Sequence, residues 1–357
     1  MNKKVWRTSA AIAVLAIPLA AVSLEIAKDD PSVGNAEIKP KAQHSLLLDI
    51  AVSEAGFVAV GERGHILISK DGTEWQQSDV PTRSTLTSVS AQGASIWAAG
   101  HDGLIVHSAD GGKTWQRQRV QPWSPESQEI TNGSAVLDTL FIDATTGYAV
   151  GAYSLLLKTE DGGATWQPLS VSGSNAPEAQ ADMVASDTGV FSESDLALAA
   201  ESDPHLNTIL RTDSGALIVL GERGAGFKSV DDGQSWKKLR LPYAGSMFGL
   251  LSLGGERVIA FGLRGNVLES LDGGNSWSNV DSGTDTSLIG GTVTDDGRII
   301  LVGGNGTLVV RSPGQSGFSA RSIQNKNGQN PAFTAAVPTK NGVLLTSDLG
   351  AVNTTVQ

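Results

Sequence analysis

Short apolar runs separated by glycine and polar turns recur along most of the chain. In each copy an apolar run ends in glycine, a second run alternates apolar and polar residues, and an Asp-Gly turn leads to tryptophan. This alternation predicts short antiparallel strands joined by tight turns. Five copies share the order: VAVGERGHILISKDGTEW from Val58, WAAGHDGLIVHSADGGKTW from Trp97, YAVGAYSLLLKTEDGGATW from Tyr148, IVLGERGAGFKSVDDGQSW from Ile218 and IAFGLRGNVLESLDGGNSW from Ile259.

The repeat period is close to that of a propeller blade. The tryptophans that end the five copies are separated by 40, 51, 70 and 41 residues. A sixth copy from Ile300 ends in Phe318, and a seventh begins at Val343. Because a four-stranded blade repeats about every 40 residues, we predict an all-β, seven-bladed β-propeller over residues 44–357. Its blades are four-stranded and antiparallel, with strands A to D running outwards from the axis.

Two of the repeats carry insertions, at residues 120–135 and 170–205. The strand order places the B–C turns and the D–A connections on one face, called here the B–C face, and the A–B turns and Asp-Gly turns on the other. Both insertions follow a D strand and are expected on the B–C face. The second has seven acidic residues and no Lys or Arg, which fits either a solvated loop or a partner-binding segment.

The seventh copy has room for three strands, predicted at Ala332–Val337, Val343–Ser347 and Ala351–Val356. An incomplete blade leaves an open sheet edge. We therefore expect Glu37–His44 to add the outer strand and close the ring, because an outer strand tolerates Pro40 on its unpaired side.

The polar turn of each copy follows the pattern S/T-x-D-G-G-x-S/T-W, the Asp-box of bacterial neuraminidase repeats, and is one residue shorter in the first copy. Its carboxylate can accept backbone N–H bonds while the tryptophan covers the blade edge. Because one device recurs in every blade, a structural role is favoured over an acid–base array. The paired residues are Asp71 and Trp75, Asp110 and Trp115, Asp161 and Trp166, Asp231 and Trp236, and Asp272 and Trp277.

The composition excludes several kinds of function. The net charge of -11 argues against nucleic-acid binding, which needs a basic surface. The sequence has no cysteine, which excludes disulfides, thiolate metal sites, cysteine nucleophiles and a lipid-modified cysteine. The five histidines show no metal-ligand spacing, so we expect no metal and no cofactor.

The N-terminal residues have the pattern of an export signal. Lys3, Lys4 and Arg7 precede an uncharged run from Thr8 to Leu24, with small residues at Ala21-Val22-Ser23. We interpret residues 1–24 as a signal peptide, with an uncleaved membrane anchor as the alternative, and residues 25–43 as a lead-in that contains the latch strand. The protein is then periplasmic or otherwise exported.

Enzymatic chemistry has little support in the sequence. A sialidase needs an arginine triad, a tyrosine nucleophile with a glutamate and an Arg-Ile-Pro motif, and this motif is absent. A glycosidase with two carboxylates from distant blades stays open, because no local motif marks it. We expect no catalytic residues and keep a glycan-binding or glycoside-hydrolysing propeller as the alternative function.

Three arginines share one position in the repeat. Arg63, Arg223 and Arg264 each lie in a G-x-R-G turn between strands B and C, where the other copies have Asp102, Tyr153, Asn305 and Leu349. Together they predict a cationic patch for carboxylates, although exposed turn arginines are also ordinary. Three further residues expected on this face could contribute to partner binding: Arg83, Trp123 and Tyr243.

The repeats resemble the photosystem II assembly/stability factor propeller family, in particular its members in non-photosynthetic bacteria. The resemblance rests on the Asp-boxes that follow turns such as Gly147-Tyr148-Ala149-Val150-Gly151, and on Pro204-His205-Leu206-Asn207. It implies a non-enzymatic protein that holds a membrane-protein subunit during assembly through an arginine-rich patch, carried over to Arg63, Arg223 and Arg264. In this chain Asp102 and Leu349 interrupt the patch.

The expected function is therefore a protein-binding scaffold or assembly factor. Its partner would be a membrane-protein complex or another envelope protein, and the non-photosynthetic relatives suggest a transporter of the RND type. The propeller itself is expected to be monomeric.

Overall fold

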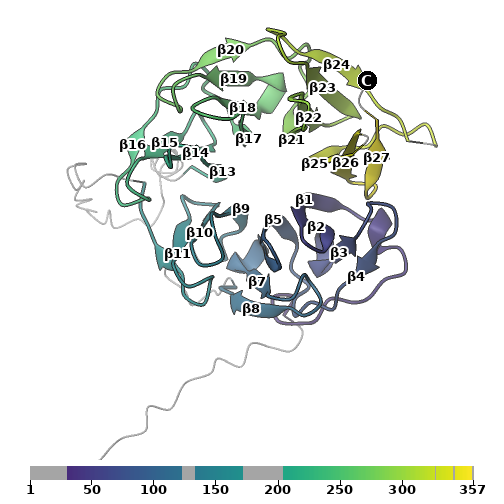
Figure 1. Cartoon of the computed structure of the whole chain (residues 1–357). Coiled ribbons are helices and arrows are strands. Elements are labelled where there is room, and N and C mark those ends of the chain that lie inside the picture. Colours follow the sequence, from purple (N-terminus) through teal and green to yellow (C-terminus); the bar gives the residue numbers. More distant parts are fainter. Residues whose placement is uncertain (1–29, 123–132, 172–203, 326, 341, 356–357) are drawn as a thin grey trace, which may run out of the picture.

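The chain forms a ring of seven antiparallel sheets around a central axis (Figure 1). The computed structural model describes residues 30–122, 133–171, 204–325, 327–340 and 342–355. Six sheets have four strands in simple A-to-D order and the seventh has three. The predicted seven-bladed, all-β propeller is confirmed.

Blades 1 to 3 are built from twelve short strands. From the axis outwards they are β1 (Leu47–Ser53), β2 (Gly56–Gly61), β3 (Ile66–Ser69) and β4 (Gln76–Gln77); β5 (Leu86–Gln92), β6 (Ser95–Gly100), β7 (Ile105–Ser108) and β8 (Gln116–Arg119); and β9 (Val136–Phe141), β10 (Gly147–Gly151), β11 (Leu156–Thr159) and β12 (Gln167–Pro168).

Blades 4 to 7 continue the same order. Their strands are β13 (Leu206–Arg211), β14 (Leu217–Gly221), β15 (Gly226–Ser229) and β16 (Lys237–Lys238); β17 (Met247–Ser252), β18 (Val258–Gly262), β19 (Val267–Ser270) and β20 (Ser278–Val280); β21 (Leu288–Val293), β22 (Ile299–Gly303), β23 (Thr307–Arg311) and β24 (Ser319–Ser322); and β25 (Phe333–Thr339), β26 (Gly342–Ser347) and β27 (Val352–Thr354). Single 3-10 turns are η1 (Ala42–His44), η2 (Glu62–Gly64), η3 (His101–Gly103) and η4 (Leu263–Gly265). Among the described residues, no helix is long and apolar enough to cross a membrane.

The hydrophobic core lies between neighbouring blades. The second strand of each blade is apolar and almost wholly buried, as in β10, where all five residues are buried. One core cluster joins Val58 and Ile66 of blade 1 to Ile96 and Trp115 of blade 2. Burial on both faces explains why these strands are continuous apolar runs that end at a glycine turn.

The Asp-box turns are stapled hairpins. In blade 2, Asp110 accepts hydrogen bonds from the Lys113 and Thr114 amides at 3.0 and 2.9 Å. The indole of Trp115 donates to the Gly112 carbonyl at 3.0 Å. These bonds lower the pKa of the box aspartates, to about 2 at Asp231, chiefly through hydrogen bonds from side-chain hydroxyls.

A polar contact at the inner strands links one blade to the next. The inner strands carry a bulge near their start, as between Leu47 and Asp49, which turns polar side chains sideways. The Thr87 hydroxyl donates to the Val136 carbonyl at 2.5 Å, and the Thr334 hydroxyl donates to the Leu47 carbonyl at 2.7 Å. The second bond joins blade 7 to blade 1 and so closes the ring at the axis.

The N-terminal segment follows a different path from the expected latch, and that prediction needs correction. The seventh sheet contains only β25, β26 and β27 among the described strands, and Glu37–His44 does not pair with it. Instead the Gln77 side chain on β4 bonds the Lys39 amide and the Glu37 carbonyl, at 2.8 and 3.0 Å. Because these bonds hold the chain along blade 1, residues 30–44 form a strap there, ending at η1 beside blade 7.

Candidate partner-binding face

The B–C turns share one strained backbone geometry. In six blades a residue other than glycine takes a left-handed conformation, with φ between 54 and 60° at the turn centre. These residues are Arg63, Asp102, Tyr153, Arg223, Arg264 and Asn305. Left-handed φ turns the side chain out from the strand pair, so one position of the repeat is presented around the rim.

The D–A connections lie on this same face, as predicted. The Gly224 amide in the blade 4 turn donates to the Gly245 carbonyl of the following connection at 3.0 Å. At Gly64 a Cβ would come within 2.1 Å of the Thr82 carbonyl oxygen, so only glycine fits this turn against its connection. The B–C face is therefore a packed rim of turns and connections.

The three arginines differ in their surroundings. Arg63 has a side chain 73% exposed and lies 3.9 Å from the Glu62 carboxylate. Arg223 and Arg264 are exposed, and neither has an ion pair among the described residues. Arg223 and Arg264 lie in the turns of blades 4 and 5, which are neighbours in the ring. Asp102 accepts a hydrogen bond from Ser84 at 2.5 Å and interrupts the cationic ring at blade 2.

Of the remaining predicted residues, Arg83, Trp123 and Tyr243, the two that the structure describes do not share one site. Tyr243 and Arg264 line one cavity of about 350 Å³ together with Asn266 and Asn279, so the structure brings these two predicted residues together. Arg83 is half-buried beneath the strap, where its guanidinium packs against Gly34. Trp123 and most of both insertions lie outside the described residues.

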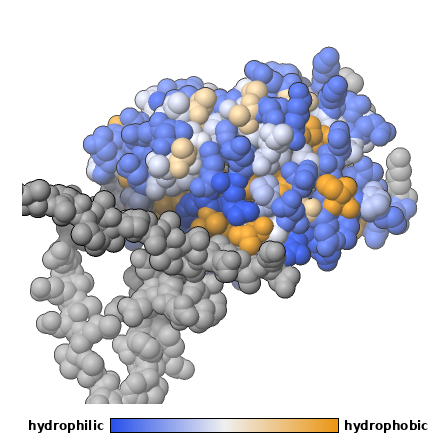
Figure 2. All heavy atoms as spheres, turned by 90° about the horizontal axis from the view of Figure 1, so that it is seen from below, coloured by the Kyte–Doolittle hydropathy of each residue, from blue (hydrophilic) through white to orange (hydrophobic). Residues whose placement is uncertain are grey.

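A larger cavity lies on the other side of the molecule. It measures about 650 Å³ and is lined by Trp75 of the blade 1 Asp-box, with Lys70 and Lys113 at its border. None of the predicted partner-binding residues lines it. The edge of the ring seen in Figure 2 is mainly hydrophilic, with small apolar patches.

An aromatic cluster between blades 3 and 4 was not predicted. The rings of Tyr153 and His205 meet edge to face with centroids 5.0 Å apart. His205 Nδ1 lies 3.7 Å from the Glu222 carboxylate, which is next to Arg223 in the turn. The repeat alignment placed Tyr153 at the arginine position, but it could not show which residue of the next blade would meet it.

Two inner-strand carboxylates were also missed. Asp49 accepts hydrogen bonds from the Ile50 amide and, across the blade interface, from the Val89 amide, both at 2.8 Å. Asp138 does the same with the Thr139 and Ile209 amides, at 2.8 and 2.9 Å. Burial raises the pKa of Asp49 to about 7 and that of Asp138 to about 6. Because both carboxylates bond backbone amides, they act as links between blades.

These shifts predict a stability maximum at mildly acidic pH. Asp49 and Asp138 titrate near 7 and 6 in the folded protein and near about 3.9 when unfolded. Their contribution is complete below about pH 4 and is lost as the pH rises through their folded pKa values. Asp231 and its equivalents have lowered pKa values and contribute oppositely, losing stability as the pH falls towards 2. We expect the highest melting temperature at about pH 4 to 5, because the loss from Asp49 and Asp138 begins above their unfolded pKa.

Thermal melts from pH 3 to 8 test this expectation. The Asp49→Asn variant should be less stable than the wild type at pH 5, because one backbone amide loses its acceptor. It should also lose less stability between pH 5 and 8, since the titrating group is gone. Parallel curves for the variant and the wild type above pH 5 would contradict the assignment.

No group of three or more His, Asp or Glu side chains placed to hold a metal ion occurs within the described part of the chain.

Comparison with known proteins shows similarity to one family over part of the chain. The family described as photosynthesis system II assembly factor YCF48 matches residues 37–127 and 118–190. The photosystem II assembly lipoprotein Ycf48 of Synechococcus sp. (strain CC9902) is 32% identical over 129 residues, which are 34% of this chain and 35% of that protein. The protein of the same name from Prochlorococcus marinus is 44% identical over 50 residues, 14% of each chain.

Over these segments the chain is similar to photosystem II assembly factors. Two solved structures have a similar fold. The structure of YCF48 bound to D1 peptide has a TM-score of 0.59 and 14% sequence identity, and the match covers 89% of this chain and 94% of that one. The structure of YCF48 from Cyanidioschyzon merolae has a TM-score of 0.60 and 17% sequence identity, and the match covers 89% of this chain and 96% of that one. The matched segments span only 14% and 35% of the curated relatives.

This propeller differs from those relatives in one chemical respect. The curated relatives are named lipoproteins, and lipid attachment to a protein through a thioether needs cysteine. The present sequence has none.

Proposed function

We propose that this propeller is a non-enzymatic scaffold or assembly factor that binds a membrane-protein partner on its B–C face. The observation that carries the proposal is the pair Arg223 and Arg264, which are exposed and without ion pairs among the described residues. Their guanidinium groups are suited to carboxylates, which they can bind through two parallel hydrogen bonds.

The relatives support the kind of partner. Two curated relatives are named assembly lipoproteins of photosystem II, and one solved relative is described as bound to a D1 peptide. By analogy, this chain would hold one subunit of an envelope complex, such as a transporter of the RND type. We further propose that it is exported through residues 1–24 and that this apolar segment, if retained, attaches it to the membrane.

Affinity capture from gently solubilised envelope membranes tests the proposal. The tagged wild-type protein is expected to retain a membrane protein, identified by mass spectrometry. The double charge reversal Arg223→Glu with Arg264→Glu should lower its recovery at least about tenfold, because attraction to a carboxylate becomes repulsion. The circular dichroism and melting curve of the variant should stay close to those of the wild type.

A matched control reverses the same charge elsewhere. Lys70→Glu with Lys113→Glu changes the border of the large cavity near the blade 1 Asp-box by the same number of charges. Capture should survive this control. Full retention by the arginine variant, or an equal loss in the control, would refute the assignment of the B–C face. A wild-type protein recovered alone, but stabilised by a carbohydrate, would favour the glycan-binding alternative.

A further inference from the structure

The blade 3 turn is more strained than its equivalents. In the blade 4 turn, left-handed Arg223 is followed by Gly224, whose φ is also positive at 70°. In blade 3 the same two positions are Tyr153 and Ser154, with φ of 54 and 57°. Two consecutive side-chain-bearing residues in the left-handed region are costly, and such strain persists only where the surroundings enforce it.

The surroundings of this turn hold the strained geometry firmly. The Ser154 amide donates to the Pro204 carbonyl at 3.0 Å, and the Ser154 hydroxyl donates to the same oxygen at 3.2 Å. The next residue, His205, supplies the ring that meets Tyr153. The start of blade 4 therefore fixes the tyrosine in place through three contacts.

The fixed tyrosine does not serve the core. Tyr153 is 46% exposed, among the few large apolar or aromatic side chains that the described surface leaves open. His205 and Glu222 are each more than a third exposed, at 36 and 38% of their side chains. The strained backbone of this turn is not offset by burial of the tyrosine ring in the core. The exposed ring therefore points to a role in recognition.

The charges around the ring indicate what it would meet. The Glu222 carboxylate is already 3.7 Å from His205, whereas Arg223 beside it has no ion pair among the described residues. Arg223 therefore presents an exposed guanidinium beside the aromatic pair, and a carboxylate complements it.

We propose that Tyr153 and His205 form an aromatic anchor for an extended segment of the membrane-protein partner. That segment would place an apolar or aromatic side chain on the ring pair and a neighbouring carboxylate on Arg223. This inference rests on the proposed function, and it adds a specificity-determining surface on blades 3 and 4 that the arginine pattern alone does not contain. A ring held rigidly before binding loses little entropy on docking.

Relief of the strain tests the anchor. Asparagine tolerates left-handed φ better than tyrosine, so Tyr153→Asn should raise the melting temperature by about 1–3 °C. The same variant should lower recovery of the membrane protein that the wild type retains from solubilised envelope membranes, about tenfold. Tyr153→Phe keeps the ring and should retain capture. Stability and binding would then move in opposite directions, which a purely structural tyrosine would not produce.

Two matched variants complete the test. Ser154→Gly restores the glycine of the other turns and should raise the melting temperature while leaving capture unchanged. Glu222→Gln should also leave capture unchanged, since the proposed ligand is acidic. An unchanged capture by Tyr153→Asn would overturn the anchor, and a tenfold loss in Glu222→Gln would show that a cation is bound instead.

Different results would refute partner binding on the B–C face and the Tyr153–His205 anchor. If Arg223→Glu with Arg264→Glu abolishes capture while Tyr153→Asn does not, the B–C face stands and the anchor is refuted. If the wild type retains no membrane protein, both are refuted.

Discussion

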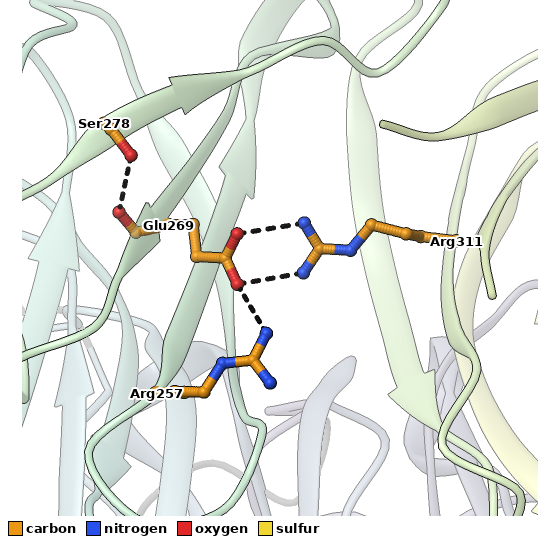
Figure 3. A network of polar contacts seen from close by, with 4 residues as sticks. All are labelled: Arg257, Glu269, Ser278 and Arg311. Carbon is orange, nitrogen blue, oxygen red and sulfur yellow. Dashed lines mark hydrogen bonds and ion pairs between the residues drawn. The ribbon is translucent and has the colours of Figure 1, made fainter. Parts of the chain in front are cut away.

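Replacement of Glu269 by alanine is expected to lower the free energy of unfolding by about 3–5 kcal/mol, because it leaves a buried guanidinium without its counterion. Arg311 is only 4% exposed. Its two terminal nitrogens each lie 3.0 Å from a Glu269 oxygen, and Arg257 reaches the same carboxylate at 2.9 Å (Figure 3). The pair links β19 of blade 5 to β23 of blade 6.

The ion pair between Glu269 and Arg311 occurs where the sixth copy of the repeat has lost its Asp-box. Arg311 occupies the repeat position of Ser270, which starts the Asp-box of blade 5, and Phe318 replaces the tryptophan. The guanidinium carbon lies 5.0 Å from the centre of the Phe318 ring. Where the Asp-box is lost, blade 6 is thus held to blade 5 by this ion pair, and the guanidinium also packs against the Phe318 ring.

Chemical denaturation of three variants checks this prediction. Glu160→Ala removes an exposed carboxylate paired with Lys158 and should cost less than about 1 kcal/mol. Glu269→Ala with Arg311→Ser should recover much of the stability lost in the single variant, since no charge is then left buried. A loss below about 1 kcal/mol in Glu269→Ala would show that water or another group compensates Arg311.

The repeat pattern predicts positions within a blade better than contacts between blades. The repeated tryptophans, the glycine turns and the shared position of the turn arginines all follow from aligning the copies, because each blade forms the same strands and turns. Glu269 and Arg311 lie 42 residues apart in different copies. Their contact depends on how two sheets pack, which a comparison of copies does not reveal.

The candidate partner-binding face was predictable in part for the same reason. Alignment of the copies places Arg223 and Arg264 on one rim, since the strand order fixes where each turn emerges. The Tyr153–His205 contact needed the relative placement of two blades. The inner carboxylates did leave a signal, because Asp49 and Asp138 each interrupt an otherwise largely apolar inner strand. A buried acid of this kind needs a partner, but only the structure shows that the partners are amides of the next blade.

The path of the N-terminal strap could not be predicted from the open edge of blade 7 alone. The missing strand of blade 7 gave a reason for the N-terminal segment to pair there, but a competing site on blade 1 offers specific partners. The side chain of Gln77 presents one acceptor and one donor to the backbone of the segment. At the equivalent position of blade 2, Arg117 reaches the Val33 carbonyl at 3.5 Å.

Deletion of residues 30–41 from the full chain is expected to destabilise the propeller by about 4 kcal/mol or more, since at least four strap hydrogen bonds are lost at about 1 kcal/mol each. Besides the two bonds to Gln77, the Ala36 amide donates to the Val80 carbonyl at 2.9 Å and the Arg83 amide donates to the Pro31 carbonyl at 2.7 Å. The deletion also uncovers Val80, which is fully buried in the intact protein. Thermal and chemical denaturation measure the loss.

A point variant separates the strap from a general effect of shortening the chain. Gln77→Ala removes two of the strap bonds and should cost about 1–2 kcal/mol. Lys238→Ala changes the same repeat position in blade 4, where the residue is exposed and no strap lies, and should cost almost nothing. Equal stability of Gln77→Ala and Lys238→Ala would mean that the strap rests on blade 1 without stabilising it. A selective loss in Gln77→Ala would establish that the strap stabilises blade 1 through these two hydrogen bonds.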